Sequence, residues 1–336
     1  MFKVAILGAT GYTALELLKL LRRHPFVEVV AVTSRENTNP IAVVHPSLTG
    51  QYDVNCENLK PTDLAERGVD TVFSCLPHTA TAAVAPELLE LGMKVIDFGA
   101  DYRLNSAEVF NKWYNVTHPD PDRVPNTPYG LPELFRDQIK GARLVANPGC
   151  YPTSAILPLA PLLKNDYISP DDVIIDSKSG VSGAGRKPSL KNLYPECNEA
   201  ISAYGVGTHR HTPEIEEILM NASGREAKVV FTPHLTPMDR GILTTTYSKP
   251  LKSATQEELL AYLREFYENE PFVQVVDALP STKDVIYTNR CHITVRVVGP
   301  RVVTVSVIDN LIKGAAGAAV QNFNLIHDLD ETTALI

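Results

Sequence analysis

The chain has 336 residues, of which 44% are hydrophobic and 21% charged, and its formal net charge is −8 at pH 7. This length allows more than one hydrophobic core and predicts two domains. The acidic balance and the lack of a basic run argue against nucleic-acid binding, and no apolar run reaches the ~20 residues of a membrane span. The five scattered cysteines form no CxxC pair, and no secretory leader is recognised, so a reducing cytoplasm is expected.

A glycine turn follows the first predicted strand, at 2–7. Its sequence is GATGYTA at 8–14, and leucines at helical spacing come next. Strand, glycine turn and helix form the context of a dinucleotide-binding fingerprint, although the spacing here is GxxGxxA. We expect Gly8 to close the turn, Gly11 to let a pyrophosphate approach the backbone, and the helix N-terminus to receive the phosphates. A plain strand–helix turn is the competing interpretation.

The end of the second predicted strand, at 27–33, bears on which dinucleotide is bound. NAD-specific folds place an Asp or Glu there, bonded to the ribose 2′-hydroxyl. This chain has Thr33, Ser34 and Arg35 at that place. A hydroxyl and a guanidinium suit a 2′-phosphate, so the segment predicts NADP(H), unless Arg35 is only a solvated surface charge.

Further strands at 70–76, 94–98 and 142–146, with a helix at 81–91, predict a Rossmann-type, doubly wound parallel sheet. Ligands of such sheets lie at the carboxyl ends of the strands. Several chemically capable residues are expected at these ends, namely Ser74, Pro77, Asp101, Arg103 and Cys150. Residues 104–141 are rich in Pro, Asn and Tyr and are predicted to be loops with one short helix, covering the mouth of the site.

Cys150 lies in the segment NPGCYPT at 147–153, between a predicted strand and a helix predicted at 154–163. A thiol at a helix start experiences the partial positive charge of unpaired N–H groups, which lowers its pKa and favours the nucleophilic thiolate. The alternative is a buried cysteine that only fills the junction. The shared position of Cys150 and the other strand-end residues favours the catalytic interpretation.

Two histidines in the second half could act with this thiol. His209 and His211 lie in HRHTPE, where Thr212 and Pro213 predict a helix start with Thr212 as its cap. Histidine titrates near neutral pH, so acid–base partnership with Cys150 is favoured. No third ligand with metal-site spacing lies nearby, so no metal is predicted, and a purely structural hydrogen-bonding role stays open for either ring.

The second half also contains the glycine-rich segment KSGVSGAGR at 178–186, which could lie against a flat ligand or be a flexible loop. Strands then predominate, with one helix at 256–267, and predict a mixed, largely antiparallel sheet whose outer face is an oligomer interface. A last helix at 310–326 is expected to pack on the first domain. The predicted strands of this half are 173–177, 228–234, 242–248, 292–298 and 302–308.

We therefore expect a Rossmann domain at 1–149, completed by 310–336, and an α+β catalytic and dimerisation domain at 150–309. The ordered motifs GATGYTALELL, DFGADYRL, NPGCYPT, SKSGVSGAGR, YGVGTHRHTPEI, FTPHLTPMDRGI and DNLIKGAAG resemble those of the N-acetyl-gamma-glutamyl-phosphate reductases. This family of arginine biosynthesis lies within the larger semialdehyde dehydrogenase group. The resemblance covers the whole chain.

The resemblance implies NADPH-dependent reduction of an acyl phosphate to an aldehyde and phosphate, in a homodimer or homotetramer. Cys150 matches the nucleophile that forms a thioester, His209 the acid–base residue, and His211 a second candidate for that role. Substrate contacts are expected from Arg103, Asn147, Glu199 and Arg240. Cofactor contacts are expected from Gly8, Thr10, Gly11, Tyr12, Thr13, Ser34, Arg35, Pro77, Ser182, Gly183 and Asn310.

Three alternatives stay open at this level. The substrate could be aspartyl phosphate, as in aspartate-semialdehyde dehydrogenases, or a carrier-linked aminoadipyl phosphate. A cysteine and a proline at 194–200 leave the acyl group open, whereas the lack of a basic mouth favours a small free substrate over an acidic carrier. A regulatory module that binds NADP without chemistry is the alternative from another class, because one fold hosts many functions.

Overall fold

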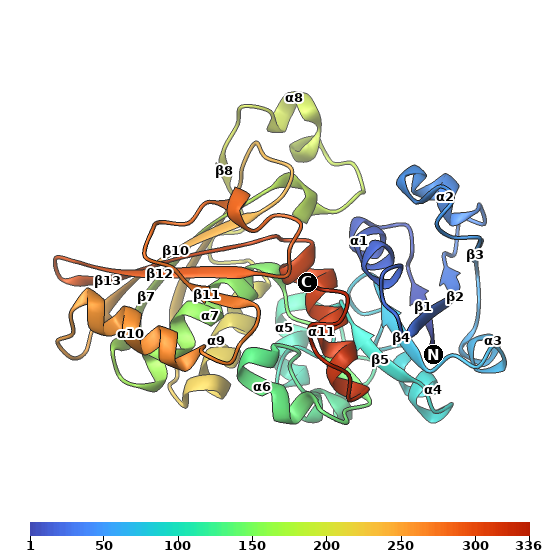
Figure 1. Cartoon of the computed structure of the whole chain (residues 1–336), viewed down its shortest axis with the longest axis horizontal. Coiled ribbons are helices and arrows are strands. Elements are labelled where there is room, and N and C mark those ends of the chain that lie inside the picture. The colour runs from blue at the N-terminus through green and yellow to red at the C-terminus, as the bar shows by residue number, and fades with distance from the viewer. The chain divides into compact units, whose positions relative to one another are not determined.

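The computed structural model describes residues 1–336 and divides the chain into two units. Unit 1 comprises Met1–Pro148 and Ala315–Ile336, and unit 2 comprises Gly149–Gly314. The ribbon in Figure 1 shows the elements of both units. None of the helices is both long and apolar enough to cross a membrane.

Unit 1 is built on a parallel sheet with the strand order β3-β2-β1-β4-β5-β6. Its strands are β1 (Phe2–Leu7), β2 (Val27–Thr33), β3 (Cys56–Glu57), β4 (Thr71–Ser74), β5 (Lys94–Asp97) and β6 (Leu144–Ala146). The order reverses between β1 and β4, which is the switch point beside which open sheets of this kind bind ligands. The predicted doubly wound sheet is confirmed.

Helices cover both faces of this sheet. On one face, Ala5 packs in a buried cluster with Leu64 and Leu88. On the other, the ring of Phe73 lies 5.6 Å from that of Phe323, centroid to centroid, so the C-terminal helix is part of unit 1. The helices are α1 (Tyr12–Leu21), α2 (Ile41–Val44), α3 (Pro61–Glu66), α4 (Ala85–Glu90), α5 (Ala107–Tyr114), α6 (Pro132–Ile139) and α11 (Gly317–Ile326).

The segment 104–141 is more helical than predicted. It contains α5, α6 and a 3₁₀ turn at Pro121–Asn126. Ser106 caps α5 by accepting the N–H of Val109 at 3.3 Å. Prolines that indicated loops instead stand in the first turns of the 3₁₀ turn and of α6, where a missing N–H costs nothing.

Unit 2 is built on a mixed sheet of seven strands in the order β11-β12-β13-β10-β7-β9-β8. The pairs β11–β12 and β7–β9 are parallel and the other four are antiparallel, which confirms the predicted mixed sheet. The strands are β7 (Ile168–Ser179), β8 (Ser202–Ala203), β9 (Val229–Leu235), β10 (Ile242–Pro250), β11 (Val273–Val275), β12 (Cys291–Val298) and β13 (Arg301–Ile308).

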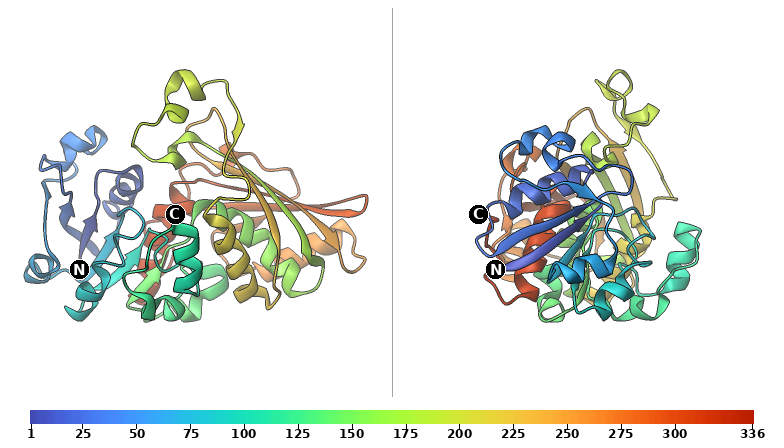
Figure 2. Two further views of the ribbon diagram at one scale, coloured as in Figure 1. Left: turned by 180° about the vertical axis from the view of Figure 1, so that it is seen from behind. Right: turned by 90° about the vertical axis from the view of Figure 1, so that its right-hand side faces the viewer.

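Longer helices of unit 2 gather on one face of its sheet, as Figure 2 shows. They are α7 (Cys150–Lys164), α9 (His211–Ser223) and α10 (Gln256–Phe266), and the short α8 (Tyr194–Cys197) lies in a loop. Along β7, Val173 and Ile175 are buried, whereas Ile174 and Asp176, which alternate with them, are partly exposed. This alternation shows that the second face of the sheet is the more open one.

Helix α7 begins at Cys150, four residues before the predicted start, and contains Pro158 and Pro161. Each proline deprives a carbonyl one turn earlier of its helical N–H partner. Those carbonyls belong to Ser154 and Leu157, and they accept hydroxyl hydrogen bonds instead. Ser306 donates to Ser154 O and Tyr267 donates to Leu157 O, both at 2.5 Å. Tertiary hydrogen bonds therefore allow two prolines inside this helix.

Two other helix starts differ from the prediction. Helix α9 begins at His211, and its N-cap is Arg210, whose side chain makes no capping hydrogen bond. Thr212 lies inside the first turn and donates its N–H to His209 O at 3.0 Å. Thr212 is therefore not the cap. The last helix does not run from residue 310, since a π-helical turn, Ile312–Ala316, precedes α11.

Candidate active site

Cys150 is the first residue of α7 and is half-buried. Gly149 precedes it in an extended conformation and donates its N–H to Oε1 of Glu214 at 2.9 Å. The first N–H groups of a helix have no partner within that helix. Those of Cys150 and Tyr151 can therefore stabilise negative charge on the sulfur or on a reacting oxygen beside it.

The backbone of Gly314 packs directly against this cysteine. A Cβ atom placed on Gly314 would lie 2.7 Å from Cβ and 3.1 Å from Cα of Cys150. Gly314 belongs to the π-helical turn and donates its N–H to Asp309 O at 2.9 Å. The sequence indicated a cofactor-related segment here, but it did not predict this contact.

His209 lies on the loop before α9, and three aromatic rings surround it. Its ring centroid lies 5.8 Å from that of Tyr151, 5.4 Å from that of Tyr204 and 5.3 Å from that of Phe231. Burial, with a smaller contribution from the charge of Arg210, lowers the pKa of His209 to about 4. Nδ1 accepts the N–H of His211 at 3.1 Å, so the neutral ring carries its proton on Nε2 and can donate from there.

His211 and Glu214 lie about one turn apart at the start of α9. Nε2 of His211 lies 3.9 Å from Oε2 of Glu214, whose other carboxylate oxygen binds the N–H of Gly149. Glu214 is buried and so connects a candidate acid–base residue to the start of the cysteine helix. Sequence reasoning missed it, although its spacing of three residues from His211 places both on one helix face.

Two tyrosines complete this surround. Tyr204 donates to the hydroxyl of Tyr151 at 3.1 Å, and Tyr151 donates to His234 O at 3.1 Å. Burial raises the pKa of Tyr204 to about 12 and also raises that of Tyr151. Both phenols therefore stay protonated at neutral pH, and they hold the ring of His209 in place without exchanging its proton.

The structure brings together three of the predicted cofactor contacts, all from unit 2. Asn310 donates to the Ser182 hydroxyl at 3.0 Å and accepts the N–H of Gly241 at 2.7 Å, and Ser182 donates to Asp239 O at 2.6 Å. A Cβ placed on Gly183 would lie 3.5 Å from Nδ2 of Asn310. This small, rigid cluster leaves a backbone surface on which a flat ring could lie.

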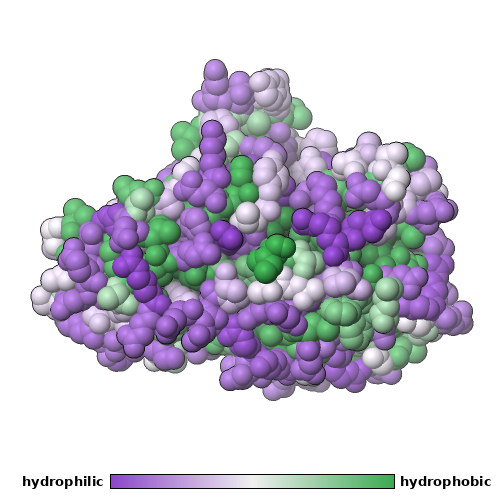
Figure 3. Space-filling view, in the orientation of Figure 1, coloured by the Kyte–Doolittle hydropathy of each residue, from purple (hydrophilic) through white to green (hydrophobic).

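The predicted substrate residues of unit 2 differ in their surroundings. Arg240 is buried, with Nε 3.3 Å from Asp309 Oδ2 and its guanidinium 4.7 Å from the centre of the Tyr287 ring. Glu199 is exposed at a φ of 58° near α8. The surface around α8 carries apolar as well as polar residues (Figure 3). Arg240 is thus held in place by its neighbours, whereas Glu199 is not.

In unit 1, the glycine turn after β1 is closely packed against the end of β4. Gly8 has a φ of 75°, and a Cβ there would lie 2.7 Å from Cys75 O. Gly11 is the extended N-cap of α1, without a side-chain cap. His45, which sequence reasoning missed, donates Nε2–H to Ala9 O at 2.8 Å and holds the turn. Thr10, Tyr12 and Thr13 lie in this turn and in the first turn of α1, so the N–H groups there fit a pyrophosphate.

The remaining cofactor candidates of unit 1 lie at strand ends. Ser34 and Arg35 follow β2, where Ser34 Oγ accepts the N–H of Asn37 at 3.1 Å and Arg35 is exposed. Pro77 is exposed beyond the end of β4. The end of β2 thus carries the hydroxyl of Ser34 and the exposed guanidinium of Arg35 and no carboxylate, and these groups suit a phosphate.

Arg103 and Asn147 are both buried in unit 1. Nε of Arg103 donates to Asn147 O and Nη2 donates to Phe98 O, both at 2.8 Å. Asn147 also donates to Ala315 O at 3.0 Å and accepts from Asn322 at 3.1 Å. The guanidinium therefore has a bracing function in addition to any contact with a substrate.

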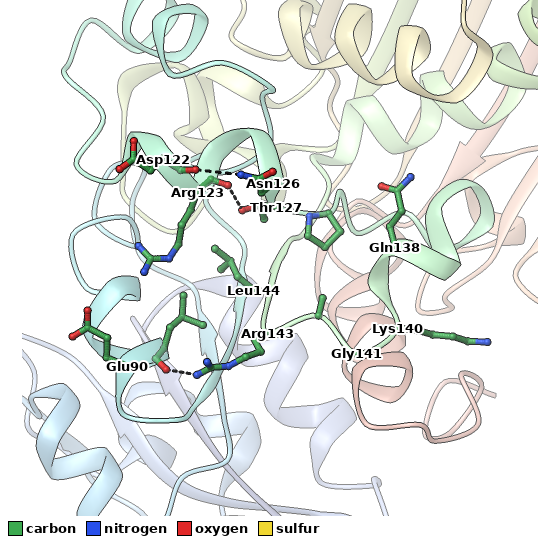
Figure 4. A pocket seen from close by; sticks show the side chains of 13 residues that line it. Glu90, Asp122, Arg123, Asn126, Thr127, Gln138, Lys140, Gly141, Arg143 and Leu144 are labelled. Atoms are coloured by element: carbon green, nitrogen blue, oxygen red, sulfur yellow. Dashed lines mark hydrogen bonds between the residues drawn. The ribbon is translucent and has the colours of Figure 1, made fainter.

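A cavity of about 600 Å³ lies elsewhere in unit 1 and includes none of the predicted residues (Figure 4). Arg143 and Leu144, at the N-terminal end of β6, line it, so it is at the opposite end of the strand from the candidate site. Nowhere do three or more His, Cys, Asp or Glu side chains gather in a way that could hold a metal ion.

Comparison with known proteins gives consistent results for both units. Residues 3–142 match the family model "Semialdehyde dehydrogenase, NAD binding domain", and residues 150–310 match "Semialdehyde dehydrogenase, dimerisation domain". The chain is 52% identical over 340 residues to an N-acetyl-gamma-glutamyl-phosphate reductase of Rhodopirellula baltica, covering 99% of this chain and 98% of the relative. A protein of the same name from Moorella thermoacetica is 50% identical, with 100% and 98% covered.

Among solved structures, the fold is similar to that of aspartate semialdehyde dehydrogenase II from Vibrio cholerae. The TM-score is 0.74 at 17% identity, over 97% of this chain and 98% of that one. At this identity the similarity concerns the fold alone. The aspartate-specific alternative is therefore supported only at the level of the wider group.

Proposed function

The chain belongs to the semialdehyde dehydrogenase family and is an oxidoreductase, and we propose that it reduces N-acetyl-gamma-glutamyl phosphate to N-acetylglutamate semialdehyde and phosphate. This activity is the one named for relatives about half identical to it over their whole length. The observation that carries the proposal is Cys150 at the first position of α7, with histidines and a buried glutamate on the neighbouring α9 and its preceding loop.

The first chemical step is displacement of phosphate by the thiolate. The Cys150 sulfur attacks the acyl carbon, a C–S bond forms, and the bond from carbon to the phosphate oxygen breaks to release phosphate. Negative charge develops on the carbonyl oxygen during the attack. The N–H groups of the first turn of α7 can stabilise this charge, whereas Pro152 has no N–H to give.

The second step converts the thioester to the aldehyde. When bound, the reduced nicotinamide supplies a hydride to the thioester carbon. The C–S bond then breaks, the electron pair returns to sulfur, and the aldehyde leaves. We propose that Nε2–H of His209 donates a hydrogen bond to the sulfur as it departs, and that the His211–Glu214 pair fixes the start of α7.

A turnover assay with two aldehydes tests the proposed substrate. In the reverse direction, N-acetylglutamate semialdehyde with NADP and phosphate should be oxidised at least roughly 10²-fold more efficiently than aspartate semialdehyde, because the pocket must bind the longer acetylated chain. Omission of phosphate should stop the reaction, since phosphate is the group that resolves the thioester. Equal efficiency with both aldehydes would instead favour a less specific enzyme.

A nicotinamide dinucleotide is the cofactor of the family, and we propose that this chain uses NADP(H). The support is the Thr33-Ser34-Arg35 segment, which has no acid to bond a 2′-hydroxyl. Arg35→Ala should raise the KM for NADPH about 10- to 100-fold and leave that for NADH within about twofold, because only NADPH has a 2′-phosphate. Arg23→Ala, an exposed arginine beyond the end of α1, is the control.

We also propose a homodimer or homotetramer that forms through the open face of the unit 2 sheet. Across this face, register pairs place Val303, Tyr247, Ile174 and Val230 in one apolar row over four strands. Tyr247→Asp should yield monomers in light scattering, because a carboxylate would lose its water in the interface. Met220→Asp, exposed on α9, should leave the assembly intact; dissociation by both variants alike would argue against this face.

A further inference from the structure

The turn between β4 and α4, residues 75–84, includes a residue in an unfavourable backbone conformation. Thr79 has a φ of 75°, and a β-branched side chain in the left-handed region is strained. One carboxylate supports this turn. Asp101 accepts the N–H of Thr79 through Oδ1 at 2.6 Å and that of Ala82 through Oδ2 at 2.9 Å. Each oxygen accepts an N–H, and such bonds stabilise the ionised form of Asp101 over the protonated one.

A second buried carboxyl group lies beside Asp101. Asp97 accepts the N–H of Gly99 at 2.8 Å, and a Cβ on Gly99 would lie 2.9 Å from Asp97 Oδ1 and 3.3 Å from Asp101 Oδ1. Two fully buried carboxylates this close cannot both ionise without a large cost. Burial and the charge of Asp101 raise the pKa of Asp97 to about 7, and burial also raises the pKa of Asp101. Asp101 accepts two backbone N–H groups and Asp97 only one, so Asp97 is the member of the pair that keeps a proton.

Other polar groups surround the pair. The Arg103 guanidinium stabilises the charge of both acids, and Nε2–H of His118 donates to the main-chain oxygen of Asp101 at 2.6 Å. Cys75 and Tyr102 face the pair as neutral groups, because burial first and the nearby acids second raise the pKa of each. On the remaining side, Nδ1 of His78 accepts the N–H of Ala100 at 3.2 Å.

The turn that Asp101 supports adjoins the glycine turn. Cys75 donates its N–H to Leu7 O at 2.9 Å, and a Cβ on Gly8 would meet Cys75 O at 2.7 Å. These contacts lie at the switch point between β1 and β4, where a dinucleotide binds in open sheets. A change in the β4–α4 turn would therefore alter the backbone against which the cofactor lies.

We propose that Asp101 is a positioning residue for the cofactor, which holds the strained β4–α4 turn in its binding shape while Asp97 carries the proton that leaves Asp101 ionised. The proposal rests on the proposed binding of NADP(H) by unit 1. Asp101 itself contacts the turn, and it acts on the cofactor through Thr79 and Ala82.

Fluorescence titration with NADPH tests the positioning role. Asp101→Asn should raise the Kd about tenfold or more, because the amide nitrogen cannot accept the second N–H. Adding Thr79→Gly should restore most of the affinity, since glycine adopts a positive φ without strain. Unchanged binding by Asp101→Asn, or no recovery in the double variant, would overturn the role of Asp101. Wild-type protein that binds no NADPH would instead overturn the proposed cofactor.

The Asp97→Asn variant tests the proton assignment and stays informative if Asp101→Asn does not fold. The pKa of Asp97 is about 7 in the folded protein, against 3.8 for the free group. The folded state therefore holds an extra proton between these pH values, and the stability of the wild type falls as pH rises from about 4 to about 7. The urea midpoint of the wild type minus that of Asp97→Asn should fall between pH 5 and pH 7 and stay level above pH 8. A constant difference would overturn the assignment.

Discussion

Replacement of Cys150 by alanine should abolish phosphate-dependent reduction of NADP by N-acetylglutamate semialdehyde, with a fall in kcat of ~10⁴-fold or more. The sulfur is the only atom proposed to bond covalently to the acyl group, so no neighbouring group can replace it. NADPH binding should stay within about twofold of wild type, because Cys150 is not among the proposed cofactor contacts and the proposed phosphate-binding turn lies in unit 1. Stopped assays of turnover and a fluorescence titration would measure the two effects.

Cys197→Ala provides the matched control for this experiment. Cys197 is a free thiol of the same unit. It lies at the end of α8 and is not part of α7. Its removal should leave turnover unchanged. Iodoacetamide should inactivate the wild type, and substrate should protect it, whereas the Cys150→Ala variant should have no substrate-protected thiol. Full activity in Cys150→Ala would remove the basis of the proposed mechanism.

Much of the fold was predictable because local patterns and tertiary structure agree. The apolar runs of β1 and β2 have the predicted bounds, and the glycine turn follows β1 as expected. Cys150 could be singled out because a strand end, a Pro-Gly turn and a small-residue helix meet there. These signals lie within a few residues of one another, so no tertiary information is needed to recognise them.

Other features depend on partners that are distant in sequence. The prolines of α7 are compatible with a helix only because Ser306 and Tyr267 donate to the abandoned carbonyls. Glu214 becomes important only when its carboxylate reaches the N–H of Gly149, 65 residues away. Asp101, similarly, is recognised as a support for the β4–α4 turn only in the folded chain. Sequence patterns contain no trace of such pairings.

Gly314→Ala should reduce kcat about 10²-fold or more with little change in NADPH binding. The added methyl would lie 2.7 Å from Cβ and 3.1 Å from Cα of Cys150, which is closer than carbon atoms approach one another, so the cysteine or the π-helical turn must move. A displacement of a few tenths of an ångström at the reacting sulfur disturbs its approach to the acyl carbon, and such misplacement is costly in rate.

Loss of stability can be separated from this loss of alignment. Gly299→Ala changes another glycine of unit 2, at a φ of 54° with open space around its Cβ position, so it should cost about 1 kcal/mol of stability and leave kcat unchanged. Gly314→Ala should reduce kcat at temperatures where it is still fully folded by circular dichroism, and its Cys150 should react with iodoacetamide at an altered rate. Wild-type kcat in folded Gly314→Ala would mean that the π-helical turn yields to the methyl group and does not align the sulfur.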